Sequence, residues 1–160
     1  MSGFAAGPCL LKDTLQLAAF SGNQFFMGHA AMLINEGLPN FVVGQLKNTN
    51  LAERCVAILG MAFKADSDDS RESLSYKLKK LMRVESREVV CSDPYVQDPS
   101  LISVDEAISR ADTIIIGVPH SVYRGLEIPA AKTVVDIWGS RDSLQQAPVS
   151  VTRSSKETRT

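Results

Sequence analysis

The 160-residue chain has a formal net charge of −1 and 44% apolar residues, so it can bury the core of one domain with an appendage or of two small units. Its balanced charge and lack of a basic cluster exclude an electrostatic nucleic-acid binder and favour small molecules or another protein chain as partners. The apolar runs fall short of the roughly 20 residues that span a bilayer, and three widely spaced cysteines without metal-ligand spacing predict no metal site and a reducing, cytoplasmic location.

The N-terminal motif Gly3-Phe4-Ala5-Ala6-Gly7-Pro8-Cys9 precedes a predicted helix that runs to Phe20. Small residues let the backbone approach a ligand closely, Pro8 suits a first helical turn, and the amides of that turn stabilise a thiolate. Asp13 follows Cys9 by four residues and should share its helical face. The pair could be a nucleophile and a proton acceptor, but a free cysteine is also often a buried small hydrophobe. The spacing alone leaves both interpretations open.

Apolar residues continue at helical spacing to about residue 47, which predicts further helix. We expect Gly37 and Pro39 to break this pattern and Pro39 to begin another short helix. Such thin helices cannot form a globule by themselves. They should therefore pack on the following domain, on a domain outside this chain or on a second copy of the chain.

The rest of the chain alternates strand-like and helix-like segments. The apolar runs typical of buried parallel strands are Arg54–Gly60, Glu88–Ser92, Asp112–Val118 and Thr133–Trp138. Helices are expected after a capping box at Asp69–Glu72, over Ser103–Arg110 and near Tyr123. This order predicts an α/β fold with a Rossmann-like, doubly wound parallel sheet that binds ligands at the carboxyl ends of its strands. Cys55 and Cys91 fall within strands and are interpreted as structural.

The segment Gly60–Ser73 follows the first strand, where a nucleotide-binding sheet holds phosphates, yet it lacks the GxGxxG spacing of a dinucleotide site. Lys64 and Arg71 could instead neutralise a diphosphate, with the amino end of the next helix adding partial positive charge. Arg71 is more simply explained by an ion pair with a nearby aspartate, Asp66, Asp68 or Asp69. For Lys64 we favour ligand contact over plain solvation.

Several polar residues follow the later strands. Asp93 could accept hydrogen bonds from ribose hydroxyls, although an Asp before Pro more often forms a turn. His120 and Ser121 could cap the short helix near Tyr123. Arg141 could reach a ligand from the end of the last strand. The sequence does not decide among these roles.

The two motifs together resemble the UDP-glucose/GDP-mannose dehydrogenase family. The residues that carry the resemblance are Gly3–Cys9 with Lys12-Asp13, and Leu59–Lys64 with Asp66, Asp69, Arg71, Glu72 and Ser73. The Ala-Ala-Gly-Pro variant is most similar to members that act on UDP-N-acetyl-hexosamines. The likeness covers about residues 3 to 141 and is specific, because both motifs occur in the family's order.

The resemblance implies that a UDP-sugar's C6 alcohol is oxidised through an aldehyde to a uronic acid while two NAD molecules are reduced. Cys9 would hold a thiohemiacetal and then a thioester, and Asp13 would assist proton transfer or the hydrolytic water. Phe4, Gly7 and Lys64 would bind the substrate, with Lys64 at its diphosphate. Arg141 would contact the cofactor.

The same resemblance divides the chain into a helical dimerising segment with the catalytic-cysteine loop (1–47), a UDP-binding domain (51–142) and a disordered tail (143–160). The family's amino-terminal dinucleotide-binding domain is not encoded here, nor are the upstream lysine and asparagine that support the oxyanion. We therefore expect a carboxy-terminal part of a homodimeric enzyme that binds NAD mainly elsewhere and does not turn over substrate alone. Two rival interpretations are a non-catalytic nucleotide-binding module and a helical assembly element.

Overall fold

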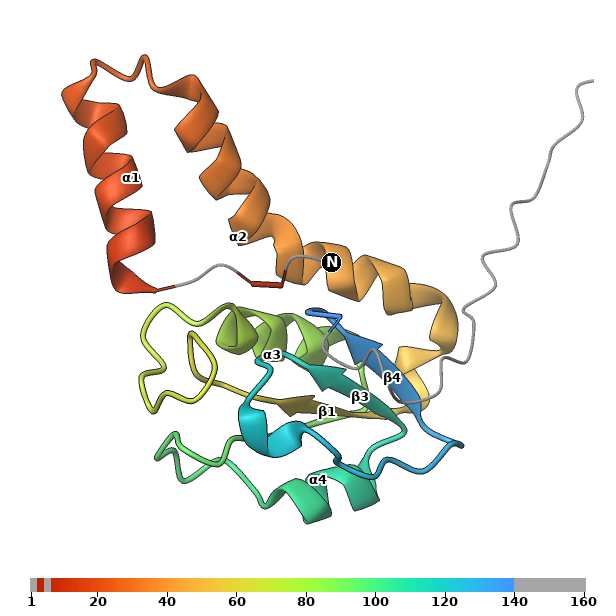
Figure 1. Ribbon diagram of the computed structural model, residues 1–160. Coiled ribbons are helices and arrows are strands. Elements are labelled where there is room, and N and C mark those ends of the chain that lie inside the picture. Colours follow the sequence, from red (N-terminus) through yellow and green to blue (C-terminus); the bar gives the residue numbers. More distant parts are fainter. Residues whose placement is uncertain (1–2, 5–6, 140–160) are drawn as a thin grey trace, which may run out of the picture.

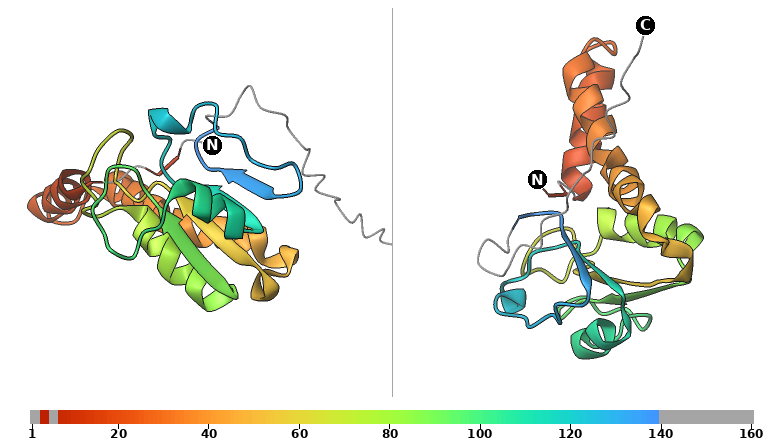
Figure 2. Two further views of the ribbon diagram at one scale, coloured as in Figure 1. Left: turned by 90° about the horizontal axis from the view of Figure 1, so that it is seen from below. Right: turned by 90° about the vertical axis from the view of Figure 1, so that its right-hand side faces the viewer.

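The computed structural model describes residues 3–4 and 7–139 (Figure 1). The alanines of the N-terminal motif, Arg141 and the predicted tail lie outside these residues. The described chain forms a sheet domain with a helical hairpin that projects away from it (Figures 1 and 2).

The sheet domain is built on four parallel strands in the order β2-β1-β3-β4. The strands are β1 (Cys55–Leu59), β2 (Glu88–Ser92), β3 (Thr113–Ile116) and β4 (Thr133–Asp136). All four lie where the apolar runs predicted them. The order places β1 and β3 in the middle, and both are buried along their whole length, as expected when helices cover both faces of a parallel sheet.

Helices cover the two faces of the sheet (Figure 1). Alternate residues of β1 point to opposite sides, so Val56 and Ile58 join one apolar cluster while Ala57 and Leu59 join another. The first cluster includes residues of α3 (Leu74–Glu85), and the second includes residues of α4 (Val104–Arg110). The doubly wound Rossmann-like architecture is therefore confirmed.

The start of α3 differs from the prediction. The helix begins at Leu74, and Ser73 caps it by accepting a hydrogen bond from the Ser75 amide at 3.2 Å. The expected capping box at Asp69–Glu72 was wrong, because Glu72 has a left-handed backbone (φ 55°) that cannot continue into a helix. Leu74, Leu78 and Met82, which recur every four residues, are buried along one side of this helix.

The amino-terminal part contains two helices, α1 (Pro8–Phe20) and α2 (Phe26–Leu46). The prediction that Gly37 and Pro39 end a helix was wrong, because α2 continues through both residues. A proline inside a helix removes one backbone hydrogen bond and bends the axis, and α2 visibly bends along its length (Figure 1). Two short 3₁₀ turns, η1 (Lys47–Thr49) and η2 (Leu51–Glu53), connect α2 to β1.

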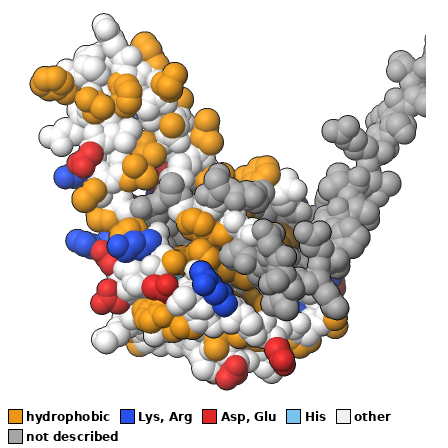
Figure 3. Space-filling model, viewed as in Figure 1, with side chains coloured by type: hydrophobic (Ala, Val, Ile, Leu, Met, Phe, Trp, Pro, Cys, Tyr) orange, Lys and Arg blue, Asp and Glu red, His pale blue; other side chains and the backbone are white. Residues whose placement is uncertain are grey.

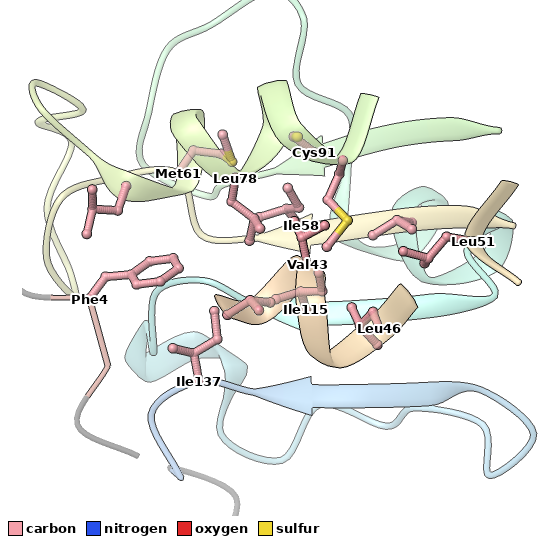
Figure 4. Packing of buried hydrophobic residues seen from close by; sticks show 14 residues of the cluster. Phe4, Val43, Leu46, Leu51, Ile58, Met61, Leu78, Cys91, Ile115 and Ile137 are labelled. Carbon is pink, nitrogen blue, oxygen red and sulfur yellow. The ribbon is translucent and has the colours of Figure 1, made fainter. Parts of the chain in front are cut away.

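The two ends of α2 lie in different surroundings. Near its carboxyl end, Val42, Val43 and Leu46 belong to the same buried cluster as α3 and the sheet (Figure 4). Its other end lies beside α1, and many hydrophobic side chains of this hairpin are exposed (Figure 3). Within the described residues, no helix is long and apolar enough to cross a membrane.

Candidate functional site

The two sequence motifs lie against each other in the structure. Gly7 has a φ of 125°, and a Cβ atom placed on it would lie 3.1 Å from the ring of Phe63, which follows β1. Gly3 has a φ of 60°, and its Cβ would lie 2.2 Å from the indole of Trp138, which follows β4. Both positions require glycine because of the backbone angle and the nearby ring. The N-terminal motif is therefore packed across the carboxyl edge of the sheet.

Phe4 helps to fix this arrangement. Its side chain is 3% exposed and belongs to the buried cluster that contains Met61 and Ile137 (Figure 4). The amide of Gly3 donates a hydrogen bond to the Ile137 carbonyl at 3.2 Å. The Phe4 ring therefore faces the core, and only the backbone of this residue is left to contact a substrate.

Cys9 is exposed in the first turn of α1, directly after Pro8. Its side chain lies near two cations, Arg71 and Lys12. The pKa of Arg71 is raised first by the hydrogen bond and charge of Asp69 and then by the Cys9 thiolate. The pKa of Lys12 is raised first by its hydrogen bond to Asp13, then by the charge of that carboxylate and of Cys9. An exposed thiol at a helix amino end beside cations has the surroundings of a reactive cysteine.

Asp13 lies one turn after Cys9 in α1, so the two residues lie on one side of the helix. Its carboxylate is exposed and forms an ion pair with Lys12, with 3.0 Å between Oδ1 and Nζ. Both side chains of this pair reach solvent. Asp13 is therefore accessible to water, as a group that moves a proton must be.

The loop after β1 carries Lys64 at its exposed side. The ammonium lies 5.3 Å from the centroid of the Phe63 ring, the same ring that lies beside Gly7. The charge of Lys64 also contributes to lowering the pKa of Asp69 to about 2, after the larger effects of hydrogen bonds from Arg71. Lys and Arg side chains gather beside the lower part of α1 (Figure 3).

Arg71 forms the ion pair that the sequence favoured. Its Nη2 atom lies 2.6 Å from Oδ2 of Asp69, and its Nε donates to the same carboxylate at 3.0 Å. This bidentate geometry occupies the guanidinium from within its own loop. Lys64 is consequently the better candidate of the two for contact with a ligand.

Behind this loop lies a buried pair, Asp93 and His120, whose side chains have no exposed surface. Asp93 follows β2 and His120 follows β3, and His120 Nε2 lies 3.0 Å from Asp93 Oδ2. The same carboxylate oxygen accepts the amides of Met61 at 2.6 Å and Ala62 at 3.0 Å. The pair thus connects three strand ends, those of β1, β2 and β3.

The hydrogen bonds of Asp93 determine its charge. Burial is the largest single effect and raises the pKa, but bonds from His120 and from the amides of Met61, Tyr95 and Val96 together lower the pKa to about 2. The bonds from Tyr95 and Val96, at 2.8 and 3.0 Å, form the turn that an Asp-Pro sequence favours. Because both carboxylate oxygens already have partners, the turn-forming role is observed and a ribose contact is not needed to explain this residue.

The described residues do not form a cradle for a dinucleotide. The loop after β1 has Met61, Ala62 and Phe63 where a pyrophosphate fingerprint needs glycines, and Met61 is completely buried in the core. The residue assigned to the cofactor, Arg141, lies outside the described residues. In the same described part, no group of three His, Cys, Asp or Glu side chains is placed to hold a metal ion.

The sequence analysis identified Cys9, Asp13, Gly7 and Lys64 as candidates, and the structure places both Gly7 and Lys64 next to the Phe63 ring. It missed the pairing of Asp93 with His120. Both residues follow predicted parallel strands directly, which was the available signal, because the carboxyl ends of neighbouring strands meet at one edge of a sheet.

Comparison with known proteins agrees with this geometry. A family model described as the UDP-glucose/GDP-mannose dehydrogenase family, UDP binding domain, matches residues 57–143. The chain is 32% identical over 126 residues to UDP-N-acetyl-D-mannosamine dehydrogenase of Pyrococcus horikoshii, a match that covers 75% of this chain and 30% of that protein. It is 25% identical over 145 residues to NDP-N-acetyl-D-galactosaminuronic acid dehydrogenase of Ralstonia nicotianae, covering 83% and 34%.

Solved structures share the fold. A UDP-glucose dehydrogenase from Pyrobaculum islandicum superimposes with a TM-score of 0.73 at 28% identity, covering 85% of this chain and 35% of that one. A GDP-mannose dehydrogenase from Pseudomonas aeruginosa gives a TM-score of 0.78 at 24% identity, covering 92% and 39%. This chain therefore spans between 30% and 39% of the length of these four relatives.

Proposed function

Because the chain belongs to the UDP-glucose/GDP-mannose dehydrogenase family, we propose that it supplies the nucleophile and the UDP-binding domain of an enzyme that oxidises the C6 alcohol of a UDP-sugar to a uronic acid. The observation that carries the proposal is the contact of Gly7 with Phe63, which brings the Cys9 motif against the Lys64 loop. The names of the relatives above favour a UDP-N-acetyl-hexosamine as the substrate.

In this proposal, Cys9 acts on the aldehyde stage of the reaction. Its thiolate adds to the C6 carbonyl carbon, a C–S bond forms, and the carbonyl electron pair moves to oxygen, which takes a proton to give a thiohemiacetal. Cys9 is exposed in the first turn of α1, where a substrate can reach its sulfur. Asp13 then accepts a proton from the water that releases the acid from the thioester.

Lys64 binds the substrate diphosphate, and the backbone of Phe4 and Gly7 lines the adjacent strip between Cys9 and the sheet. A lysine suits this role because its ammonium is a mobile point charge that can meet phosphate oxygens in several geometries. The Phe63 ring lies next to both Lys64 and Gly7. The contact between the two motifs thus allows one substrate molecule to place its sugar near Cys9 and its diphosphate near Lys64.

Oxidation of the thiohemiacetal requires a hydride acceptor, which the family resemblance implies to be NAD. The described residues of this chain do not fit that group, because bulky side chains follow β1 in place of a glycine fingerprint. We therefore place the NAD site outside the described residues. The roles assigned above to Cys9, Asp13 and Lys64 do not depend on where it lies.

Protection of Cys9 from alkylation tests the proposal. A UDP-sugar carrying a C6 aldehyde should slow iodoacetamide modification of Cys9 at least tenfold, as followed by mass spectrometry of its peptide. Cys55 and Cys91 are buried and serve as unreactive internal controls, since burial raises the pKa of Cys91 to about 11. Equal protection by UDP alone would favour a non-catalytic nucleotide-binding module, and no protection by either would contradict nucleotide binding.

We further propose that the helical hairpin pairs with a second copy of the chain. The hairpin exposes side chains that soluble proteins normally cover, with exposed fractions of 90% for Phe20, 84% for Met27, 73% for Phe26 and 70% for Ile34. Two copies of an apolar helical surface can cover each other through a two-fold interface. The same surface would serve the rival function of a helical assembly element.

Sedimentation measurements separate a dimer from a monomer. We expect the chain to sediment as a dimer at micromolar concentration, and Phe26→Asp to shift it to a monomer because a charge cannot be buried unpaired at an apolar interface. Lys80→Gln, which also makes the net charge more negative by one unit but on the exposed side of α3, serves as the control. A wild-type chain that stays monomeric would contradict the proposed pairing.

A further inference from the structure

The loop that carries Lys64 is held by side chains on both sides of that residue. Before it, Asp93 Oδ2 accepts the amides of Met61 and Ala62 at 2.6 and 3.0 Å. After it, the amide of Asp66 donates to His120 Nδ1 at 2.9 Å. Only four peptide units separate Ala62 from Asp66. Lys64 stands midway between two fixed points, and both lead to the same buried pair.

The hydrogen bonds specify the chemical state of His120. Because the Asp66 amide donates to Nδ1, that nitrogen carries a lone pair, and the ring proton lies on Nε2, from which it is donated to Asp93 Oδ2 at 3.0 Å. The ring also packs against Tyr95 and Tyr123, with centroids 5.0 and 5.4 Å away. A neutral imidazole in one orientation thus connects the carboxylate after β2 to the loop after β1.

Asp66 completes this connection from the loop side. It has a left-handed backbone with a φ of 54°, and its carboxylate accepts the amide and the hydroxyl of Ser121 at 2.8 and 3.0 Å. These bonds, led by that from the Ser121 amide, lower the pKa of Asp66. Asp66 and the pair His120-Ser121 therefore bind each other reciprocally. Such a strained conformation persists only where its surroundings fix it.

We propose that His120 is a positioning residue for substrate binding, acting through Asp66 on the loop that presents Lys64 to the diphosphate. The side chains of His120 and Asp93 have no exposed surface, so neither touches the substrate. Their effect on it must pass through the backbone of the loop. This inference rests on the proposed role of Lys64 and adds the group that holds Lys64 in place.

The arrangement also explains why a buried carboxylate and a buried imidazole stand at this edge. An apolar pair of similar volume would fill the same space, but it would leave the amides of Met61, Ala62 and Asp66 without acceptors. Polar groups are needed here because the loop crosses the sheet edge without ladder partners of its own. Asp93 and His120 thus accept the backbone amides of the segment that carries Lys64, as the carbonyl groups of a neighbouring strand would do.

A double-mutant cycle with UDP-glucose binding tests the inference. By calorimetry, His120→Ala and Lys64→Ala should each raise the dissociation constant roughly tenfold, the loss expected for one charge-assisted hydrogen bond. If His120 acts through Lys64, the double variant should bind no more weakly than Lys64→Ala alone. Losses that multiply to about a hundredfold would overturn the inference, because they would show independent action.

A second variant guards against general destabilisation. His120→Asn keeps an acceptor near the position of Nδ1 and should recover affinity to within about threefold of wild type. Ile108→Ala opens a cavity in the cluster under α4, away from the loop, and should lower thermal stability without changing affinity. An affinity loss in Ile108→Ala as large as in His120→Ala would contradict a positioning role.

Hydrogen exchange tests the loop independently of any ligand. His120→Ala should speed exchange at the amides of residues 61–66 at least tenfold more than Ile108→Ala does, while both variants affect β1 alike. Unchanged protection of this segment would overturn the inference. A wild-type chain that binds no UDP-sugar would instead contradict the proposed function, and the exchange result would still decide whether His120 fixes the loop.

Discussion

The sheet domain and the helical hairpin bury their apolar residues to very different extents. Leu78 of α3 is fully buried, whereas Ile34 of α2 is 70% exposed, although both are aliphatic residues within α-helices. In the sheet domain, the apolar side of α3 is buried against the strands of the same domain. In the hairpin, α1 and the amino-terminal part of α2 pack against each other and leave the rest of their apolar surface exposed. A helix of this kind gains its stability from packing, and the proposed pairing with a second copy of the chain would supply the contacts that the hairpin lacks.

The largest effect is expected when one aliphatic side chain in each region is shortened to alanine and the losses of unfolding free energy are compared. Leu78→Ala should lower the free energy of unfolding by about 2–5 kcal/mol, because it removes a buried side chain and leaves a cavity. Ile34→Ala should change it by less than about 0.5 kcal/mol in dilute, dissociated protein. Denaturant unfolding measures both. Similar losses for the two variants would show that the hairpin surface is covered within one chain.

Much of the sheet domain could be predicted because its signals are local. The run Glu88–Ser92 has the bounds of β2, and the apolar stripe of α3 lies where helical spacing places it. The continuation of α2 through Pro39 could not be predicted in this way. That helix persists because Val42, Val43 and Leu46 pack into the core beyond the proline, and this tertiary contact overrides the local preference of proline.

The candidate site was only partly visible for a similar reason. Cys9 and Lys64 stand in short motifs that can be recognised from neighbouring residues. Asp93 and His120 are 27 residues apart and meet only because β2 and β3 flank β1. Pairing of this kind depends on the strand order, which alternation of strands and helices does not specify.

Asp93→Asn should have the next largest effect, and the effect should depend on pH. The folded pKa of Asp93 is about 2, below the value of about 3.9 in unfolded chains. Its stabilisation is therefore complete above the unfolded pKa and is lost as the pH falls through about 2. We expect the variant to unfold about 2 kcal/mol more easily at pH 7, with the difference vanishing near pH 2. A difference that is independent of pH would contradict the charged state of Asp93.

Gly7→Ala tests the contact between the two regions. The backbone φ of 125° is unfavourable for alanine, and the added Cβ would lie 3.1 Å from the Phe63 ring. We therefore expect this change to lower the free energy of unfolding by about 1–3 kcal/mol. Gly44→Ala is a matched control in α2, where a Cβ meets no atom within 4 Å, and it should stabilise the helix by about 0.5–1 kcal/mol. Thermal unfolding distinguishes the opposite signs. A harmless Gly7→Ala would show that the motif does not need its observed backbone.

The smallest effect should come from the ion pair between Lys77 of α3 and Glu36 of α2. This pair joins the hairpin to the sheet domain, but its side chains remain partly exposed to solvent. Lys77→Ala should therefore cost less than about 1 kcal/mol, and the loss should shrink at high salt. Urea unfolding at low and high ionic strength measures it. A loss that salt does not change would indicate a packing role for the lysine stem instead.

The most direct test of the account is calorimetric titration of the chain with a UDP-sugar. We predict one binding site per chain, an affinity that falls roughly tenfold in Lys64→Ala, and no change in Lys80→Ala, which removes an exposed lysine from α3. Equal affinities for wild type and Lys64→Ala, or no binding to either, would contradict the claim that the loop after β1 holds the substrate diphosphate.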